Sequence, residues 1–392
     1  MRAYWIMASV IFLSFTAHGA TNPFYSLYAT SLGASLGEVP LIVGVYATVA
    51  LVAGLVWGRI ADRIGRRKPF IVGALAVHAA VNLGVSLAPT WLALIPLRTV
   101  EGVASGAYQV ASMALMGDIL ANHPGRARLV SGYRMSGSLA FSVAIVTSGW
   151  LAQTVGFRGS FTFAAAVYAL ALAISLVIVE PGPRPGHLVG GDAAASYRAL
   201  LRGPMLPLLV IAASFTLPVA AVYSVWPIWI ADDLGYGRAV FSQLWGIAAF
   251  VEVPCMFLAG RLIDRFGRRP TFVAGLSCFS LVFLAYVAAP PLPGLVAAQV
   301  LRGFAYAAFT ATALTMAIEL APADARGRAS GLFASAQSLA SISGSWLGGP
   351  LAAAAGFKSL FVMGAAIVLA GAAYSQLAIR RERVAQPPGS AR

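Results

Sequence analysis

Long apolar runs divide this chain, and short polar segments separate them. Each run approaches or exceeds the roughly 20 residues that an α-helix needs to cross a bilayer. An even number of spans places both termini on one side of the membrane. The pattern predicts twelve transmembrane helices, near residues 6–29, 39–59, 69–88, 91–119, 129–154, 159–180, 205–231, 239–261, 270–289, 293–320, 329–354 and 357–379.

One longer polar segment follows the sixth run and begins with several prolines and glycines. Such a segment is typical of a flexible linker. We therefore expect an all-α membrane protein made of two six-helix bundles, residues 1–180 and 204–392, joined by a cytoplasmic linker over 181–203. The start of the first run resembles a secretory signal peptide, but apolar sequence continues to about Tyr28, which favours an uncleaved first helix.

The composition supports a membrane protein. Hydrophobic residues make up 59% of the chain and charged residues 10%, and a bilayer accepts this much apolar surface. The net charge of +14 could suggest nucleic-acid binding, but most Lys and Arg fall in loops on one side of the predicted helices. Basic loops stay cytoplasmic, so the charge predicts cytoplasmic termini and contact with membrane lipid, and we expect no nucleic-acid partner.

The two halves repeat each other in one loop. Residues 58–67 recur as residues 260–269 with seven of ten positions identical, and Gly156-Phe157-Arg158 recurs as Gly356-Phe357-Lys358. Internal repeats of this kind in helical membrane proteins suggest a solute site between two halves that move against each other. The repeat is the main sequence evidence for transport.

The residue types of the repeated loop suggest a structural role. Glycine permits close helix approach or a sharp turn, and an aspartate can accept charge-assisted bonds from arginine or face a helix N-terminus. The alternative is a topology anchor with solvated charges. We assign a cytoplasmic gate to the loop and to two acidic helix ends: Gly58, Asp62, Arg63, Gly65, Arg66, Asp118, Asp264, Arg265 and Glu319.

The fourth run carries charges inside an apolar helix. Arg98, Glu101, Ser105 and Gln109 recur at intervals of three and four, so they share one helix face. An arginine in mid-membrane costs at least about 2.5–3.5 kcal/mol and needs a partner or a watery cavity. Two interpretations stay open: a fixed ion pair between Arg98 and Glu101, or a cavity wall with a titrating carboxyl.

Other helices carry polar or aromatic candidates. His78, Asn82 and Ser86 in the third run share the four-residue spacing of a polar stripe in the first run (Ser14, His18, Asn22 and Ser26), and we expect a packing role for those in the third run. Glu252 and Arg302 could form a pair in the second half. With the fourth run, the candidates for solute binding are His18, Asn22, Arg98, Ser105, Gln109, Arg134, Tyr223, Trp226, Trp245, Arg302 and Tyr306, and those for proton coupling are Glu101 and Glu252.

Both repeated loops resemble the signature of the major facilitator superfamily, and the resemblance covers nearly the whole chain. It implies the major facilitator fold, with a latching role for Asp62 and a weaker one for Asp264. Arg98-Thr99-Val100-Glu101-Gly102 is similar to the family's Arg-x-x-Gln-Gly motif, with Glu in place of Gln.

Short segments point to branches of that family. Residues 252–254 with 259–261 are similar to sugar-efflux transporters, and residues 134–138 resemble the oligosaccharide–proton symporters, in which an arginine here binds sugar and pairs with a fourth-helix glutamate. Drug–proton antiporters are the alternative. Their Gly-Pro near the end of the fifth helix is replaced here by Ser148-Gly149-Trp150.

The sequence thus predicts a proton-coupled secondary transporter of the inner membrane for a small polar solute such as a sugar, with a multidrug antiporter as the alternative. A non-transporting receptor or an intramembrane enzyme is the second class, but no nucleophile motif or metal spacing supports it. Cys255 and Cys278 sit inside predicted helices and form no disulfide framework. We expect a small-molecule solute and protons as partners, no cofactor or metal, and a monomer.

Overall fold

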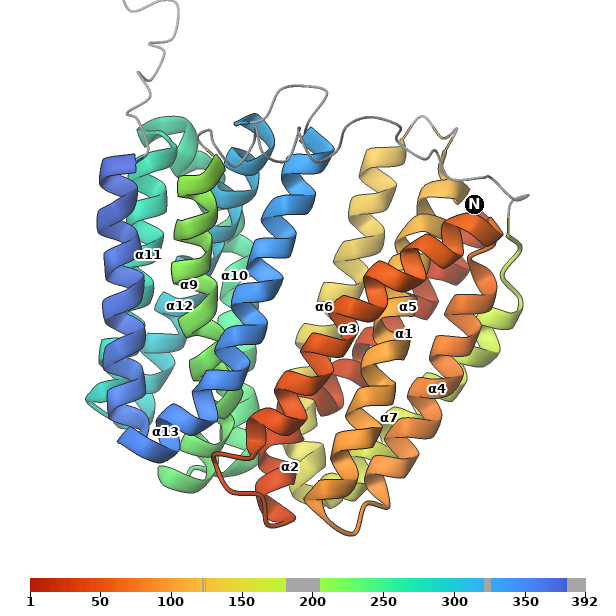
Figure 1. Ribbon diagram of the computed structural model, residues 1–392, viewed down its shortest axis with the longest axis horizontal. Coiled ribbons are helices and arrows are strands. Elements are labelled where there is room, and N and C mark those ends of the chain that lie inside the picture. Colours follow the sequence, from red (N-terminus) through yellow and green to blue (C-terminus); the bar gives the residue numbers. More distant parts are fainter. Residues whose placement is uncertain (122, 124, 181–204, 321–325, 379–392) are drawn as a thin grey trace, which may run out of the picture. The chain divides into compact units, whose positions relative to one another are not determined.

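The computed structural model describes residues 1–121, 123, 125–180, 205–320 and 326–378, and these residues are all helical or loop (Figure 1). Among them no strand is present. The predicted linker over 181–203 lies outside the described residues. The longer helices are α1 (Arg2–Thr21), α3 (Val39–Ile64), α4 (Lys68–Ser86), α5 (Leu94–Ile119), α6 (Arg126–Thr154), α7 (Gly156–Leu176), α9 (Met205–Ile228), α10 (Gly237–Phe266), α11 (Arg268–Val287), α12 (Leu292–Glu319) and α13 (Arg326–Ala378).

Shorter elements extend two of these helices. The η1 turn (Asn22–Phe24) and α2 (Tyr25–Ser31) continue α1 after a break at Pro23, and η3 (Trp229–Asp233) continues α9. A further short turn, η2 (Trp91–Ala93), leads into α5. Helix α13 is two helical segments, since Gly356 inside it has φ 78° and ψ 164°.

Ten helical stretches among the described residues are long and apolar enough to cross a membrane. Helix α5 has 26 residues but is not one of the ten; Arg98, Glu101 and Asp118 lie on it. Large apolar side chains such as Trp150, Phe250 and Leu377 are exposed. In water such a surface would aggregate, so it indicates contact with lipid.

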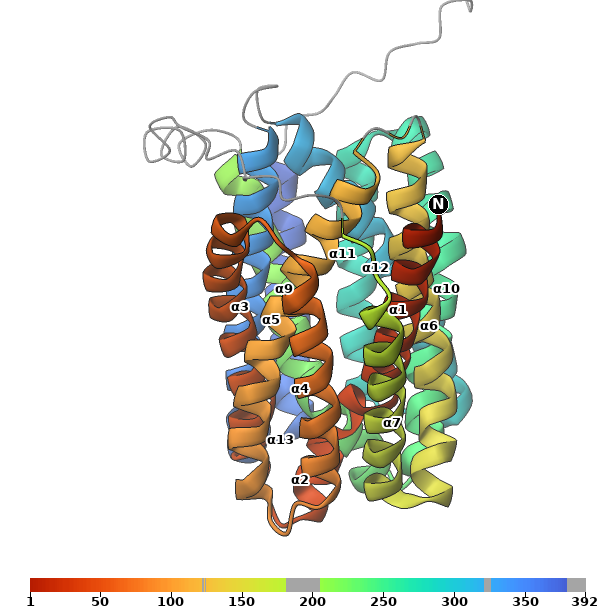
Figure 2. The same ribbon diagram turned by 90° about the vertical axis from the view of Figure 1, so that its right-hand side faces the viewer.

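The described residues form two compact units. The first contains residues 1–180 and Ser224–Gly246; the second contains residues 205–223 and those from Ile247 onward. In the first unit, α3 packs on α5, α1 on α6 and α7, and α4 on α5 and α7 (Figures 1 and 2). In the second unit, α11 packs on α12 and α13.

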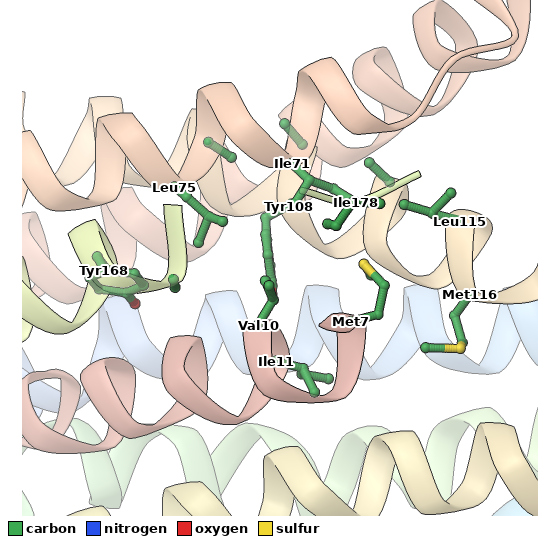
Figure 3. Packing of buried hydrophobic residues seen from close by; sticks show 14 of the residues in the cluster. Met7, Val10, Ile11, Ile71, Leu75, Tyr108, Leu115, Met116, Tyr168 and Ile178 are labelled. Carbon is green, nitrogen blue, oxygen red and sulfur yellow. The ribbon is translucent and has the colours of Figure 1, made fainter. Parts of the chain in front are cut away.

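A cluster of buried apolar side chains joins the helices of the first unit (Figure 3). Met7 and Val10 of α1 lie on the side toward Tyr108 of α5, whereas Ile11 packs near Gly137 of α6. The same cluster includes side chains of α4 and α7. Because lipid is as apolar as these side chains, close packing rather than removal from water holds the helices together.

Glycines let two helix pairs approach closely. A Cβ built on Gly106 of α5 would lie 2.6 Å from the Gly54 amide nitrogen and 2.8 Å from the Ala50 carbonyl oxygen on α3. In the second unit, a Cβ on Gly303 of α12 would lie 2.7 Å from the Ala248 carbonyl oxygen on α10. Both positions need glycine because only a missing side chain permits this approach.

The repeated loops share a positive φ at the equivalent glycine, although ψ differs (10° at Gly65 and 170° at Gly267), and their basic residues make similar contacts. Gly65 and Gly267 both have positive φ, 67° and 87°, which ends α3 and α10. In the first unit, Lys68 Nζ donates to the Leu176 carbonyl at the end of α7, at 2.6 Å. In the second, Arg269 donates to the backbone and side chain of Gln376 near the end of α13. Each basic loop therefore holds the last helix of its own half.

The segment Ser224–Gly246 packs within the first unit. The Arg238 guanidinium lies 3.8 Å from the centre of the Phe157 ring, and its NH1 donates to the Ala152 carbonyl at 3.1 Å. Phe241 meets Phe24 edge-on, with ring centres 5.4 Å apart. The first unit thus combines most of the first half with the connection between α9 and α10.

Candidate functional site

An ion pair is buried in the first unit. Arg98 NH1 lies 2.7 Å from Glu101 Oε2, and both side chains are almost completely buried, at 1% and 2% exposure. The pair spans one turn of α5, as the i,i+3 spacing predicts. Of the two interpretations offered by the sequence, this geometry favours the ion pair over a carboxyl open to water.

Two tyrosines from neighbouring helices enclose the arginine. The Arg98 guanidinium carbon lies 3.9 Å from the Tyr25 ring centre and 3.8 Å from the Tyr46 ring centre. The Tyr25 hydroxyl also donates to Glu101 Oε2 at 2.9 Å. A desolvated cation between aromatic faces gains about 2 kcal/mol from the ring quadrupoles. These contacts satisfy the charge without water.

His78 of α4 lies on the other side of Glu101. Its Nδ1 is 3.9 Å from Glu101 Oε1, and its Nε2 is 3.4 Å from the Ser105 hydroxyl, which in turn accepts from Tyr46 at 3.0 Å. The imidazole stacks on Tyr168 of α7, with ring centres 4.9 Å apart. The sequence assigned His78 to packing; the structure places it beside the buried carboxylate.

A second cluster surrounds Arg302 of α12 in the second unit. Arg302 NH1 donates to Gln299 Oε1 at 3.0 Å, and its guanidinium lies 4.2 Å from the Tyr223 ring centre. Gln299 Nε2 donates to the Tyr286 hydroxyl at 2.6 Å, and that hydroxyl is 3.0 Å from the Tyr223 hydroxyl. Gln299, Tyr223 and Tyr286 are neutral groups.

Glu252 of α10 belongs to the same unit but is held differently. It is half-buried, and its charge acts on Arg302 and Tyr306. Within the described part of the chain Glu252 makes no hydrogen bond or close ion pair. Glu252 therefore interacts with Arg302 electrostatically over a distance and does not form the close pair that the sequence suggested. The hydrogen bond of the arginine goes to Gln299.

Several candidates lie apart from these clusters. Gln109 and Arg134 are exposed. His18 is half-buried, near Phe141 and within electrostatic range of Glu101, and Asn22 begins the η1 turn. Trp226 is fully buried, with its ring centre 5.9 Å from that of Trp245. These two tryptophans contribute to packing in the first unit.

The residues assigned to the cytoplasmic gate differ in exposure and in their contacts. Arg63, Arg66, Asp264 and Arg265 are exposed, Asp118 is half-buried, and Gly58 lies in ordinary contact with Val110. The side chain of Asp62 lies outside the described residues. Glu319 forms an ion pair with Arg268 of its own half, so its visible partner is not in the other half.

The sequence missed Tyr25, Tyr46 and His78 as members of the first cluster. Each is on a different helix from Arg98, and nothing in the spacing of one helix shows what another helix brings to it. The buried arginine was the usable signal, because a mid-membrane cation needs partners. Within the described residues no group of three metal-ligating side chains is present.

Comparison with known proteins places this architecture in a family. The family model described as "MFS_1 like family" matches residues 4–363. The chain belongs to this family of the major facilitator superfamily. It is accordingly a multi-pass membrane transporter and not an enzyme, as the repeated loops indicated.

Relatives of this transporter have different names. A multidrug resistance protein MdtG of Dickeya zeae is 26% identical over 391 residues, covering 95% of this chain and 93% of the relative. A maltose permease of Geobacillus stearothermophilus is 29% identical over 334 residues, covering 82% of this chain and 80% of the permease.

Solved structures agree in fold. The nucleoside transporter NupG superposes with a TM-score of 0.80 at 14% identity, covering 97% of this chain and all of that one. A bacterial homologue of the lysosomal transporter Spinster gives 0.77 at 16% identity, covering 96% of this chain and 95% of that one. Likeness at this identity shows the fold alone.

Proposed function

We propose that this transporter moves a small polar solute, with a sugar as the first candidate, by proton-coupled alternating access. The observation that carries the proposal is the second-unit cluster. There a partly buried carboxylate, Glu252, acts on Arg302 from another helix without a tight ion pair of its own, and the neutral Gln299 accepts a hydrogen bond from the arginine. A carboxylate that no close cation holds as the anion can take up and release a proton.

Glu101 is less suited to that role. It accepts bonds from Arg98 and Tyr25 in a site that is almost completely closed to water. Protonation would remove the counter-ion of a buried arginine, which costs about 3–5 kcal/mol. We therefore propose that Glu252 exchanges the transported proton and that Glu101 stays ionised as the partner of Arg98.

Sugar recognition rests on the kind of groups available. Tyr223 offers an aromatic face and a hydroxyl, and Arg302 offers several donors, which suits a ring with hydroxyl groups. In the first unit, His18, Gln109 and Arg134 remain candidates for contacts with the solute. The relative named maltose permease supports this choice.

Drug–proton antiport is the second candidate. Its support is the relatives named multidrug resistance protein, which match nearly the whole chain. A hydrophobic cation would need an apolar or acidic surface rather than the arginine-centred clusters. The two candidates differ in what they would carry and not in how the proton would be coupled.

Transport in liposomes separates these possibilities. Purified protein is reconstituted, a pH gradient is imposed, and movement of radiolabelled maltose and of ethidium is followed. One proton moving down 100 mV supplies about 2.3 kcal/mol, enough for roughly 50-fold accumulation or extrusion. We expect pH-driven movement of the sugar. Movement of ethidium alone would support the drug antiporter, and flux indifferent to pH would refute proton coupling.

The finer topology is also a proposal. We propose twelve membrane spans, of which α5 is one and α13 forms two. The two halves are residues 1–180 and 204–392. Both termini are cytoplasmic, and the protein is a monomer in the inner membrane. The basic loops support this orientation. Reporter fusions after the loops near Arg66 and Arg268 should show both on the cytoplasmic side; a reporter active outside would overturn it.

A further inference from the structure

The two carboxylate oxygens of Glu101 have unequal surroundings. Oε2 accepts hydrogen bonds from Arg98 at 2.7 Å and from Tyr25 at 2.9 Å. Oε1 has His78 Nδ1 at 3.9 Å, beyond hydrogen-bond distance. We propose that His78 is a positioning residue for the buried ion pair: a neutral imidazole that carries its proton on Nδ1 and directs it at Glu101 Oε1.

A chain of hydroxyl groups supports this position of the proton. Tyr46 donates its hydroxyl proton to the Ser105 oxygen, at 3.0 Å. The proton of Ser105 is then available for His78 Nε2, which lies 3.4 Å away. A ring nitrogen that accepts a hydrogen bond carries no proton, so in the neutral ring the proton must be on Nδ1.

Burial and stacking support the same assignment. His78 is 4% exposed, and its Nδ1 has no hydrogen-bond partner among the described residues. The ring lies nearly parallel to Tyr168, at 14°, which holds its plane. A buried N–H without a partner is costly, and Glu101 Oε1, 3.9 Å away, is the acceptor on that side of the ring.

The Arg98–Glu101 pair has no net charge, so burial of the whole group favours a neutral His78. Arg98 on α5 and His18 on α1 act on the same site as Glu101. The hydroxyls of Tyr25 and Tyr46 and the stacked Tyr168 complete the surroundings. A second cation beside Arg98 would leave an excess buried charge, whereas a neutral donor stabilises the carboxylate without changing the total. His78 would thus hold Glu101 in its ionised, paired form. This inference does not depend on the solute or on proton coupling.

Nitrogen NMR of histidine tests the proton position directly. The chain has four histidines, so full-length protein labelled with ¹⁵N-histidine gives few ring signals, and His78→Phe identifies those of His78. At pH 7 we expect Nδ1 to be protonated and Nε2 unprotonated. A ring protonated on Nε2, or on both nitrogens, would overturn the proposal.

Ser105→Ala tests the chain of hydroxyl groups. Without the serine proton, Nε2 loses its donor, and the Nε2-protonated form should become populated. An unchanged His78 spectrum would contradict the proposed order of donors. Neither spectrum requires transport, so failure of this inference is distinguishable from failure of the proposed function.

A second measurement separates positioning from stacking. His78→Phe keeps a ring against Tyr168 but has no donor, whereas His78→Gln keeps an N–H donor. The fall in melting temperature caused by Glu101→Gln is measured in each background. We expect Glu101→Gln to lower the melting temperature roughly half as much in the His78→Phe protein as in wild type, and as much as in wild type in the His78→Gln protein. The reason is that the effects of mutations at two contacting groups are not additive in a double-mutant cycle. Equal falls in both backgrounds would overturn the role.

Discussion

The two units each contain a buried or partly buried arginine on an equivalent helix, but they balance its charge differently. Arg98 has an ionised partner one turn away and two tyrosine rings around it. Arg302 has the neutral Gln299 one turn away and the Tyr223 ring beside its guanidinium. In the second unit the acidic group, Glu252, comes from another helix.

The distance between the two charges is fixed in the first unit and can change in the second. Arg98 and Glu101 lie on the same helix, so a movement of whole helices leaves their distance unchanged. Glu252 and Arg302 lie on α10 and α12, so a small shift between those helices changes the field at each charge. We infer that the first cluster stabilises its unit and that the second is the one that responds.

Removing the carboxylate charge should produce the largest difference in stability between the two units. Glu101→Gln leaves Arg98 without its counter-ion and should reduce the free energy of unfolding by about 3–5 kcal/mol. Glu252→Gln removes a charge with no tight partner and should change it by less than about 1 kcal/mol. Thermal unfolding of both variants in the same detergent checks this; equal losses would contradict the assignment of a fixed pair to the first unit alone.

Tyrosine hydroxyls allow a finer test. Tyr25→Phe removes a hydrogen bond to an ionised carboxylate, worth about 1.5–3 kcal/mol, while the ring over Arg98 remains. Tyr223→Phe removes a bond between two neutral hydroxyls, worth about 0.5–1.5 kcal/mol, and also keeps its ring. The unfolding midpoints of the two variants should follow that order, and the reverse order would show that Glu101 is not held as an anion.

The two glycines at close helix contacts, Gly106 and Gly303, should have similar effects on stability in the two units. Gly106→Ala and Gly303→Ala each force a methyl group into a neighbouring backbone and should each cost about 1–3 kcal/mol. Gly58→Ala is the matched control, since its added methyl meets Val110 only at 3.6 Å. A large loss at one crossing and none at the other would mean that the scaffold is less symmetric than its sequence repeat.

The scaffold was largely predictable from the sequence because its signals are local. Apolar runs located the helices, and the repeated glycines Gly65 and Gly267 occupy the positive-φ turns that only glycine adopts easily. The Arg98–Glu101 pair followed from spacing along one helix. The break at Gly356 lies between the predicted helices 329–354 and 357–379, whereas the break at Pro23 lies inside the predicted first helix, 6–29.

The partners of the charges were not predictable in the same way. Tyr25, Tyr46 and His78 reach Arg98 and Glu101 from three other helices, and this depends on helix packing and rotation. Gln299 was not among the candidates for solute binding or proton coupling, yet it accepts a hydrogen bond from Arg302. Arg134, which resembled a sugar-binding arginine, is exposed, while Arg98 pairs with the fourth-helix glutamate.

The central claim is that Glu252 carries the proton and Glu101 does not. The most direct measurement compares two modes of transport by Glu252→Gln in liposomes: pH-driven accumulation of the solute, and exchange of labelled for unlabelled solute without a gradient. The account predicts that accumulation is lost while exchange continues at close to the wild-type rate. Accumulation that persists in Glu252→Gln would contradict it.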